Sequence, residues 1–480
     1  MTLYPALLNS MTALKAIGTG IRVTSDNVAN ANNEEYNKRI TKYQNYVFGG
    51  VQVADIERVA NEGLNKDLRN AIALAARDET AAGYYTQLEE ITGVISNNPA
   101  LTEKVEAFVS AYKAFEAAPE SGAAEREVVL AGQSLVSELH RVSNGIEQID
   151  RSVKDDTILS VTELNTLLTE IDALNDKIIR DSNLQIPTAN LENIRDAKLD
   201  DLSEIMEIRT FKQNDNRMTV YSSTGLALVD AVAEQFTWDE TTQTLTRTGS
   251  TVNVADQVST GRLRAQLDFI RTDAASVASS NALLAPIEKL RNQLDDFARL
   301  WVDVTTAQTF GEAYRVNPAP PLFGGGAPYT ADWDELFFIP LDPANDLPAD
   351  VDRFNIQVRP ALVSGADTVP QQTANDVIEQ LDASSRALSA GALVLASETY
   401  SGISSGILAR LVSNAGVVDQ DATLEIALRD DLQIRLDNEV RVDIDEEMAV
   451  INILQNSYAA NARVVNTVNE LFDDLMNTIR

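Results

Sequence analysis

Apolar side chains recur at alternating intervals of four and three positions from Val440 to Arg480. This spacing places them on one face of an α-helix, as in a coiled coil. Glycine and proline are absent from the stretch, so it predicts one helix from about Asp443, roughly 55 Å long. The main stripe consists of Ile444, Met448, Ile451, Gln455, Tyr458, Ala462, Val465, Asn469, Phe472, Met476 and Ile479. A second stripe consists of Val450, Leu454, Val464, Val468, Leu471 and Leu475. One helix cannot bury two stripes alone, so the pattern predicts a partner.

The other end of the chain carries the same spacing, in Leu3, Leu7, Met11, Leu14, Gly18, Ile21, Ser25 and Val28. Pro5 is tolerated only in the first turn of a helix, which predicts a start near Thr2. The asparagine-rich stretch 27–33 favours a cap or a turn and predicts the helix end. Gly18 and Gly20 weaken this helix in isolation. The two terminal helices are either the first and last members of an ordinary bundle or a pair that contacts other subunits.

Helical and β-type patterns alternate between the two ends. Gly49-Gly50 separates two β-type runs within residues 36–60, which predicts a hairpin. Two more hairpins are predicted within 204–257, around 214–221 and 236–247. Helical periodicity predicts helices at 64–95, 101–117, 125–149, 157–180 and 283–304.

The C-terminal half is interrupted by a stretch that is rich in proline and glycine. Residues 311–360 are predicted to hold little regular structure apart from a strand-like run at 353–359. From about Ala374 helical character returns, with breaks predicted at Gly402, Gly406 and Gly416. An i, i+4 apolar edge leads toward the last helix through Leu424, Leu428, Leu432 and Leu436.

The predicted fold class is mainly α with a β-rich insertion. Paired terminal coiled-coil helices enclose an α-helical bundle domain, and an outer domain of β and irregular structure is inserted in the middle. A chain of 480 residues is long enough for two to four domains. The predicted boundaries are 1–44 and 440–480 for the terminal domain, 45–203, 258–312 and 375–439 for the α-rich domain, and 204–257 and 313–374 for the insertion.

Both ends also carry recognisable motifs. Asn27-Val28-Ala29-Asn30-Ala31 followed by Tyr36 resembles the N-terminal signature of the flagellar axial proteins, the family of rod, hook and hook-associated proteins. The segments 445–449, 458–464 and 470–475 resemble the C-terminal signature of that family, in the form of its hook-associated members. Internal stretches near 49–58, 171–178 and 322–324 are similar to the same members. One departure is Asn33-Glu34-Glu35, which stands where the family has Thr-Pro-Gly before the tyrosine.

The resemblance implies a structural component of the bacterial flagellum that self-assembles through its terminal helices at the hook–filament junction. It implies a homo-oligomeric ring, with the flagellar hook protein and the next hook-associated protein as neighbours and an export chaperone as a further partner. The implied location is extracellular, reached by flagellar type III export without a cleaved signal peptide. The residues expected at the assembly interface are Leu7, Met11, Leu14, Ile21, Val28, Asn30, Tyr36, Ile451, Tyr458, Val465 and Phe472.

Composition excludes several other classes. Asp and Glu number 72 against 39 Lys and Arg, a net charge of −33, which argues against binding to nucleic acid or to anionic membrane surfaces. The absence of cysteine excludes disulfides, thiolate catalysis and cysteine-based zinc sites. No apolar run is long enough for a transmembrane helix, and the first thirty residues lack a signal-peptide pattern.

Three motifs could carry chemistry, and each has a simpler interpretation. Gly402-Ile403-Ser404-Ser405-Gly406 matches a nucleophile elbow, but no histidine follows it, so a flexible Ser/Gly joint is predicted. His140, the only histidine, cannot build a zinc site alone. Asp445-Glu446-Glu447 lacks a calcium-loop pattern and suits the positive end of a helix dipole. We therefore predict no enzyme, no cofactor and no metal site.

Three alternatives remain open at this stage. A flagellar hook protein is the nearest, although the helix-rich residues 62–205 and the C-terminal motif argue against it. A cell-wall hydrolase attached to the flagellum is disfavoured because no catalytic triad is found. A coiled-coil adaptor unrelated to flagella predicts a stable dimer, whereas an axial protein predicts a monomer that assembles only on a template.

Overall fold

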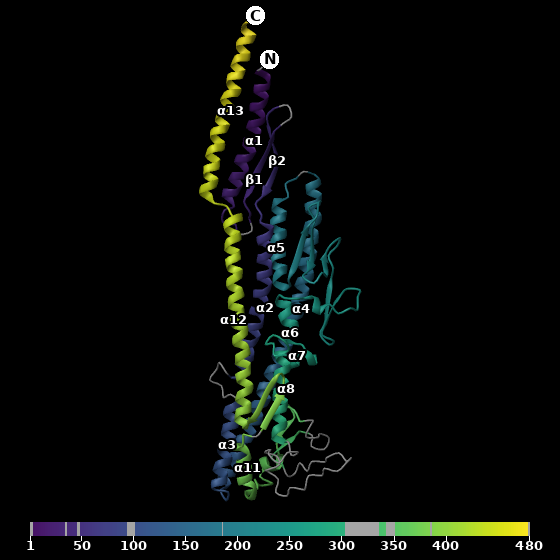
Figure 1. The fold of residues 1–480 in the computed structure, drawn as a ribbon, viewed down its shortest axis with the longest axis vertical. Helices are drawn as coiled ribbons and strands as arrows, with labels where there is room; N and C mark the ends of the chain where they lie inside the picture. The colour runs from purple at the N-terminus through teal and green to yellow at the C-terminus, as the bar shows by residue number, and fades with distance from the viewer. Residues whose placement is uncertain are drawn as a thin grey trace.

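The chain forms an elongated molecule with both termini at the same end (Figure 1). The computed structural model describes residues 3–33, 36–45, 49–93, 101–184, 186–302, 336–341, 351–384 and 386–478. Two long helices, α2 (Glu62–Thr92) and α12 (Tyr400–Val440), pack side by side as a spine. The coarse part of the predicted class, mainly α with some β structure, is confirmed, and the strands form small antiparallel sheets.

Beyond one end of this spine lie the terminal helices α1 (Leu3–Ala29) and α13 (Ile444–Thr478), which pack against each other. Both fall where the heptad-like spacing predicts them. The predicted hairpin is also present, as β1 (Arg39–Asn45) and β2 (Val51–Arg58), and it lies against α1. We call α1 and α13 together the terminal pair.

The far end of the spine is built on α3 (Leu101–Ala117) and α4 (Gly122–Asn183). The prediction of two separate helices at 125–149 and 157–180 is wrong, because α4 continues through them for 62 residues. Val153, between the two predicted segments, and Thr157, at the start of the second, are fully buried, so the buried face is uninterrupted. Ser121 starts the helix by accepting a hydrogen bond from the amide of Ala124.

Two hydrophobic cores lie along α4. The larger core joins α2, α3, α8 (Pro286–Val302), α11 (Ala374–Asp382) and the first half of α12. The smaller joins the second half of α4 to a set of short elements. These are α5 (Ala189–Ile205), β3 (Ile208–Lys212), β4 (Met218–Ser222), β5 (Ala227–Val229), β6 (Phe236–Asp239), β7 (Thr244–Arg247) and α6 (Arg262–Phe269). The antiparallel pairs β3–β4 and β6–β7 are the two predicted hairpins.

Short elements complete the larger core. They are the antiparallel pair β8 (Phe338–Pro340) and β9 (Ile356–Val358), and α10 (Pro360–Ser364). The short helix α7 (Ala274–Ala278) contacts α8 without contributing to that core. The strand predicted at 353–359 is confirmed in β9. The stretch 322–324 lies outside the described residues.

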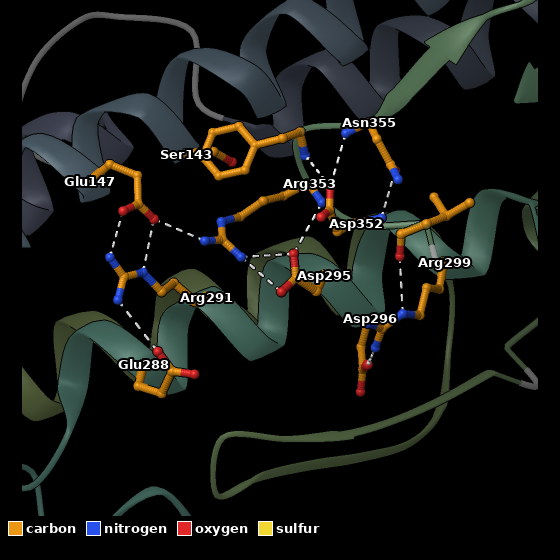
Figure 2. Close-up of polar contacts among 12 residues, drawn as sticks. Ser143, Glu147, Glu288, Arg291, Asp295, Asp296, Arg299, Asp352, Arg353 and Asn355 are labelled. Carbon is orange, nitrogen blue, oxygen red and sulfur yellow. Dashed lines mark hydrogen bonds and ion pairs between the residues drawn. The ribbon is translucent and has the colours of Figure 1, made fainter. Parts of the chain in front are cut away.

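A polar cluster fixes the segment before β9 to the body. Figure 2 shows Arg353 between Glu147 of α4 and Asp295 of α8. Its guanidinium donates to Asp295 Oδ1 and Oδ2 at 2.8 and 2.7 Å and to Glu147 Oε1 at 2.9 Å. Arg291 donates to Glu147 Oε2 at 2.6 Å from the other side. The cluster therefore ties together three parts of the chain that are distant in sequence.

Two predictions between 374 and 440 are wrong. Where helix was expected, residues 386–398 form the hairpin β10 (Arg386–Ala390) and β11 (Leu393–Glu398). Its turn residues Gly391 and Ala392 have φ of 52° and 63°, as a two-residue hairpin turn of type I′ requires. The motif at 402–406 is the first part of α12 rather than a flexible joint, and Gly416 does not break that helix. Thr399 caps the start of α12. The contacts of α12 with α2 and with the hairpin outweigh the low helix propensity of its glycines.

Candidate assembly interface

The terminal pair buries a seam that runs between the two apolar stripes of α13. Glu447 and Val468 are the buried positions, and Ile451, Leu454, Val465 and Phe472 are half-buried. Opposite them, α1 contributes the buried Ala16 and Val23. The half-buried residues on α1 include Leu7, Leu14, Ile21 and Val28. The seam thus takes residues from both predicted stripes, and neither stripe is fully covered by the partner helix.

Large apolar side chains remain uncovered on both helices of the pair. On α1 they are Tyr4, Leu8 and Met11. On α13 they are Ile444, Met448, Val450, Ile453, Tyr458, Val464, Leu471 and Met476. Isolated apolar residues are normal on protein surfaces, whereas these residues recur along the length of both helices. Met476 is 65% exposed and Met11 is 56% exposed, so packing within the terminal pair does not bury these side chains.

A polar node closes the base of the terminal pair. Asn27 of α1 is 1% exposed and Glu447 of α13 is 3% exposed. Asn27 Nδ2 donates to Glu447 Oε2 at 2.8 Å and to the Arg39 carbonyl at 2.9 Å. Asn27 Oδ1 accepts from the Tyr36 hydroxyl at 2.9 Å and from the Arg39 amide at 3.0 Å. One side chain therefore connects α1, the start of β1 and α13 with its full hydrogen-bonding capacity.

Lys38 supplies the positive charge of this node. Its Nζ lies 2.7 Å from Glu446 Oε2 and 3.2 Å from Glu447 Oε1. Burial alone lowers the pKa of the Lys38 amine, but its hydrogen bonds to the two carboxylates outweigh burial and raise it. For Tyr36, burial is the main cause of a raised pKa. The Arg39 guanidinium carbon lies over the Tyr36 ring, 4.7 Å from its centroid. The buried Glu447 carboxylate is thus both paired and hydrogen-bonded, as a buried charge requires.

The same node joins the terminal pair to the spine. The Lys38 amide donates to the Val440 carbonyl at 2.8 Å, and the Lys38 carbonyl accepts from the Val59 amide at 2.8 Å. Asn61 Nδ2 donates to Glu439 Oε2, also at 2.8 Å. Asp443 caps α13 by accepting from the amides of residues 445 and 446. The segments near residues 38, 60 and 440, which connect the spine to the terminal pair, are therefore hydrogen-bonded to one another.

The interface residues expected from sequence fall into four groups. Leu7, Leu14, Ile21, Val28, Ile451, Val465 and Phe472 lie half-buried on the two packed helices. Met11 and Tyr458 are exposed, and Tyr36 is buried in the node. Asn30 makes only a local bond from its Nδ2 to the Asp26 carbonyl at 2.8 Å.

Sequence reasoning missed Asn27 and Glu447 as partners. The acidic run 445–447 was interpreted as a helix-dipole feature, which is incomplete because Glu447 is buried and bonded to Asn27 and Lys38. The available signal was the position of Glu447, four residues before Ile451 on the buried face. A charged residue at an apolar position of a heptad pattern indicates a buried polar contact.

Two further findings concern the described residues only. They contain no group of three or more His, Cys, Asp or Glu side chains arranged to hold a metal ion. Among the same residues, no helix combines the length and the apolar character needed to span a membrane.

His140 is half-buried on α4, and burial lowers its pKa.

Comparison with known protein families gives two matches. Residues 85–309 match the flagellar hook-associated protein FlgK helical domain, and residues 440–478 match the C-terminal family of flagellar basal body rod FlgEFG proteins. Flagellar hook-associated protein 1 of Bacillus subtilis strain 168 is 21% identical over 99% of this chain and 98% of its own length. The protein of the same name from Escherichia coli K12 is 22% identical over 46% of this chain and 42% of its own. A solved structure of the flagellar hook junction protein FlgK from Burkholderia pseudomallei aligns over 55% of this chain and 47% of its own, with 21% identity and a TM-score of 0.40.

These matches confirm the resemblance seen in the terminal motifs: the chain is related to the axial proteins of the bacterial flagellum. Within that class, its similarity over nearly the full length is to flagellar hook-associated protein 1. The match at 85–309 covers the helix-rich region that argued against a hook protein.

Proposed function

We propose that this chain is a structural subunit of the hook–filament junction and that it joins the axial assembly through its terminal pair. The observation that carries this proposal is the series of uncovered apolar side chains along α1 and α13, from Tyr4 to Met476. Burial of one such side chain contributes about 1.5–3 kcal/mol. Several of them buried against neighbouring subunits offset the loss of freedom on association.

The position of the pair within the molecule supports the same function. The pair lies beyond the end of the spine, and the described residues of α1 and α13 take no part in the two cores along α4. They also take no part in the small cluster of Leu68, Leu436 and Val440 between α2 and α12. The cores of the body are therefore complete without the pair. We infer that the terminal pair serves assembly and that coiled-coil packing is completed when subunits meet.

The partners follow from this geometry and from the family. We infer that the subunits form a homo-oligomeric ring that contacts the hook protein on one side and the next hook-associated protein on the other. An export chaperone that covers the apolar face before assembly fits the same surface. The role is structural, without catalysis, and the location is the extracellular flagellum.

The proposal is tested by adding purified protein to isolated hooks that lack caps and filaments, followed by electron microscopy. New density confined to the distal tip of the hook is expected. A chain lacking residues 444–480 is the control, and it should remain folded by circular dichroism but leave the tips bare. Growth of long hook-like tubes would indicate a hook protein, and a stable dimer that ignores hooks would indicate a free coiled-coil adaptor.

A further inference from the structure

A lysine is buried without a carboxylate partner at the start of α8. Lys289 is 6% exposed, and its Nζ donates to the carbonyl of Asn281 at 2.8 Å. Within the described part of the chain, Lys289 forms no ion pair within 4.0 Å. By contrast, the buried Arg69 and Arg353 are each paired with carboxylates. A buried ammonium usually needs such a counter-charge.

Among the described residues, the pocket beside Lys289 is lined by a second cationic residue and by no acidic residue. Arg410 of α12 lines it, and Arg410 Nη2 donates to the Ser280 carbonyl at 3.3 Å. Tyr85 of α2 completes the set, because its hydroxyl donates to the Ala282 carbonyl at 2.5 Å. Three successive carbonyls therefore take donors from three helices, and the residues that line the pocket include no aspartate or glutamate. Two positive charges share a pocket in a chain whose net charge is −33.

The size of the pocket limits what could neutralise them. Water-sized spheres can be centred within about 20 Å³ of this pocket, so it accommodates a small ligand. The turn of the β10–β11 hairpin forms its opposite wall, where Gln293 Nε2 donates to the Gly391 carbonyl at 3.1 Å. A Cβ on Gly391 would collide with the Lys289 carbonyl oxygen, so only glycine lets the turn approach α8 this closely.

We propose that the Lys289–Arg410 pocket binds a single small monovalent anion of the halide class, chloride under physiological conditions. The ion neutralises the two cations and links α8, α12 and the β10–β11 hairpin. This inference is independent of the flagellar assignment, because it concerns the interior of the body and not the terminal pair.

The titration of Lys289 is consistent with an unneutralised site. Burial is the main cause that lowers the pKa of its amine to about 8, and the charge of Arg410 adds to the effect. The titratable groups around it are Arg410 from α12 and Tyr85 from α2. Anion binding should therefore weaken as the pH rises through 8, when the ammonium loses its proton while Arg410 stays charged.

The test measures thermal unfolding of the full chain at fixed ionic strength while sodium gluconate is replaced by sodium chloride. We expect the Tm at pH 7 to rise by a few degrees and to saturate with chloride, and the rise to shrink at pH 9.5. Lys289→Met should abolish the chloride response whatever its effect on the Tm itself. Lys113→Met is the matched control, because Lys113 is exposed and paired with Asp382, and it should keep the response.

A direct measurement decides the location. Crystals soaked in sodium bromide should show an anomalous peak between Lys289 Nζ and the Arg410 guanidinium. Arg410→Gln, at a half-buried position that tolerates a polar side chain, should weaken the peak. A map without a bromide peak in this pocket would overturn the proposal, and so would an unchanged chloride response in Lys289→Met.

Discussion

Asn27 and Glu447 are 420 positions apart in the chain, yet Asn27 Nδ2 donates a 2.8 Å hydrogen bond to Glu447 Oε2 inside the terminal pair. This contact fixes how α1 and α13 are aligned along each other. An apolar seam alone tolerates sliding by a helical turn, whereas a buried polar pair is satisfied in one alignment only. The alignment of α1 against α13 therefore depends on this pair.

Asn27→Asp should loosen the terminal pair, because it places a second carboxylate against Glu447 and removes the donor for the Arg39 carbonyl. A loss of about 2–3 kcal/mol is expected for the buried contacts. Hydrogen exchange of the α1 and α13 amides should accelerate while that of α4 stays unchanged. Glu447→Gln added to Asn27→Asp restores a donor facing the new carboxylate and should recover part of the protection. Equal exchange in the single and double variants would show that charge repulsion is not the cause.

Tyr458→Asp should impair assembly on hook tips with little effect on the stability of the monomer. Tyr458 is 44% exposed on α13, so the aspartate remains solvated in the isolated subunit and is buried only in the assembly. Asn466→Asp, at an exposed polar position of the same helix, is the control for the added charge. The measurements are tip occupancy by electron microscopy and the Tm of the free protein. A Tm loss as large as the loss of assembly would place Tyr458 in the fold of the monomer instead.

Gly18 and Gly20 should respond in opposite directions to alanine. Nothing lies within 4 Å of a Cβ on Gly18, so Gly18→Ala should stabilise α1 by about 0.5–1 kcal/mol through helix propensity. A Cβ on Gly20 would meet the Tyr43 hydroxyl oxygen and would lie 3.3 Å from Leu454 Cδ1.

Gly20→Ala should therefore displace the Tyr43 ring from α1 and lower the free energy of unfolding. Removing the hydroxyl with Tyr43→Phe should restore part of the lost stability. Denaturant unfolding of the three variants, followed by hydrogen exchange of the hairpin, provides the comparison. If Gly20→Ala is as stabilising as Gly18→Ala, the hairpin does not pack closely on α1 in solution.

Arg353→Met should destabilise the body by about 3 kcal/mol, because it leaves Asp295 without its bidentate partner in a region where the arginine is buried. Arg435→Met, which removes an exposed pair with Asp431 at 2.8 Å, should cost less than about 1 kcal/mol. Urea unfolding of both variants gives the two free energies. Similar losses would mean that the cluster in Figure 2 contributes no more than a surface ion pair.

Acid should weaken the body through Glu147. Burial raises the pKa of this carboxyl, but the hydrogen bonds and charges of Arg291 and Arg353 outweigh burial and bring it below the ordinary 4.5. The folded chain therefore binds fewer protons than the unfolded chain just below pH 4.5, and the free energy of unfolding falls as the pH drops through that range. Glu147→Gln should lower stability at pH 6 and flatten its decline between pH 5 and 3. A decline as steep as that of the unmodified chain would assign the acid sensitivity to other carboxylates.

The sequence by itself determined the elements whose signal is local and long. The four-three spacing located α1 and α13, and the paired β-type runs located the hairpins β1–β2, β3–β4 and β6–β7. The terminal motifs determined the relation to flagellar axial proteins, because they are contiguous strings of residues. Periodicity and motif are both readable without knowledge of what each residue contacts.

Only the tertiary structure decided the features that depend on distant contacts. The β10–β11 hairpin and the glycines inside α12 are held by packing against α8 and α2, which outweighs local propensity. The pairing of Asn27 with Glu447, and the face of α13 that remains uncovered, depend on the rotation of one helix against another. A heptad pattern fixes which residues share a face, but it does not fix how far the partner helix covers that face. For this reason the terminal helices could be predicted, whereas their polar node and their free surface could not.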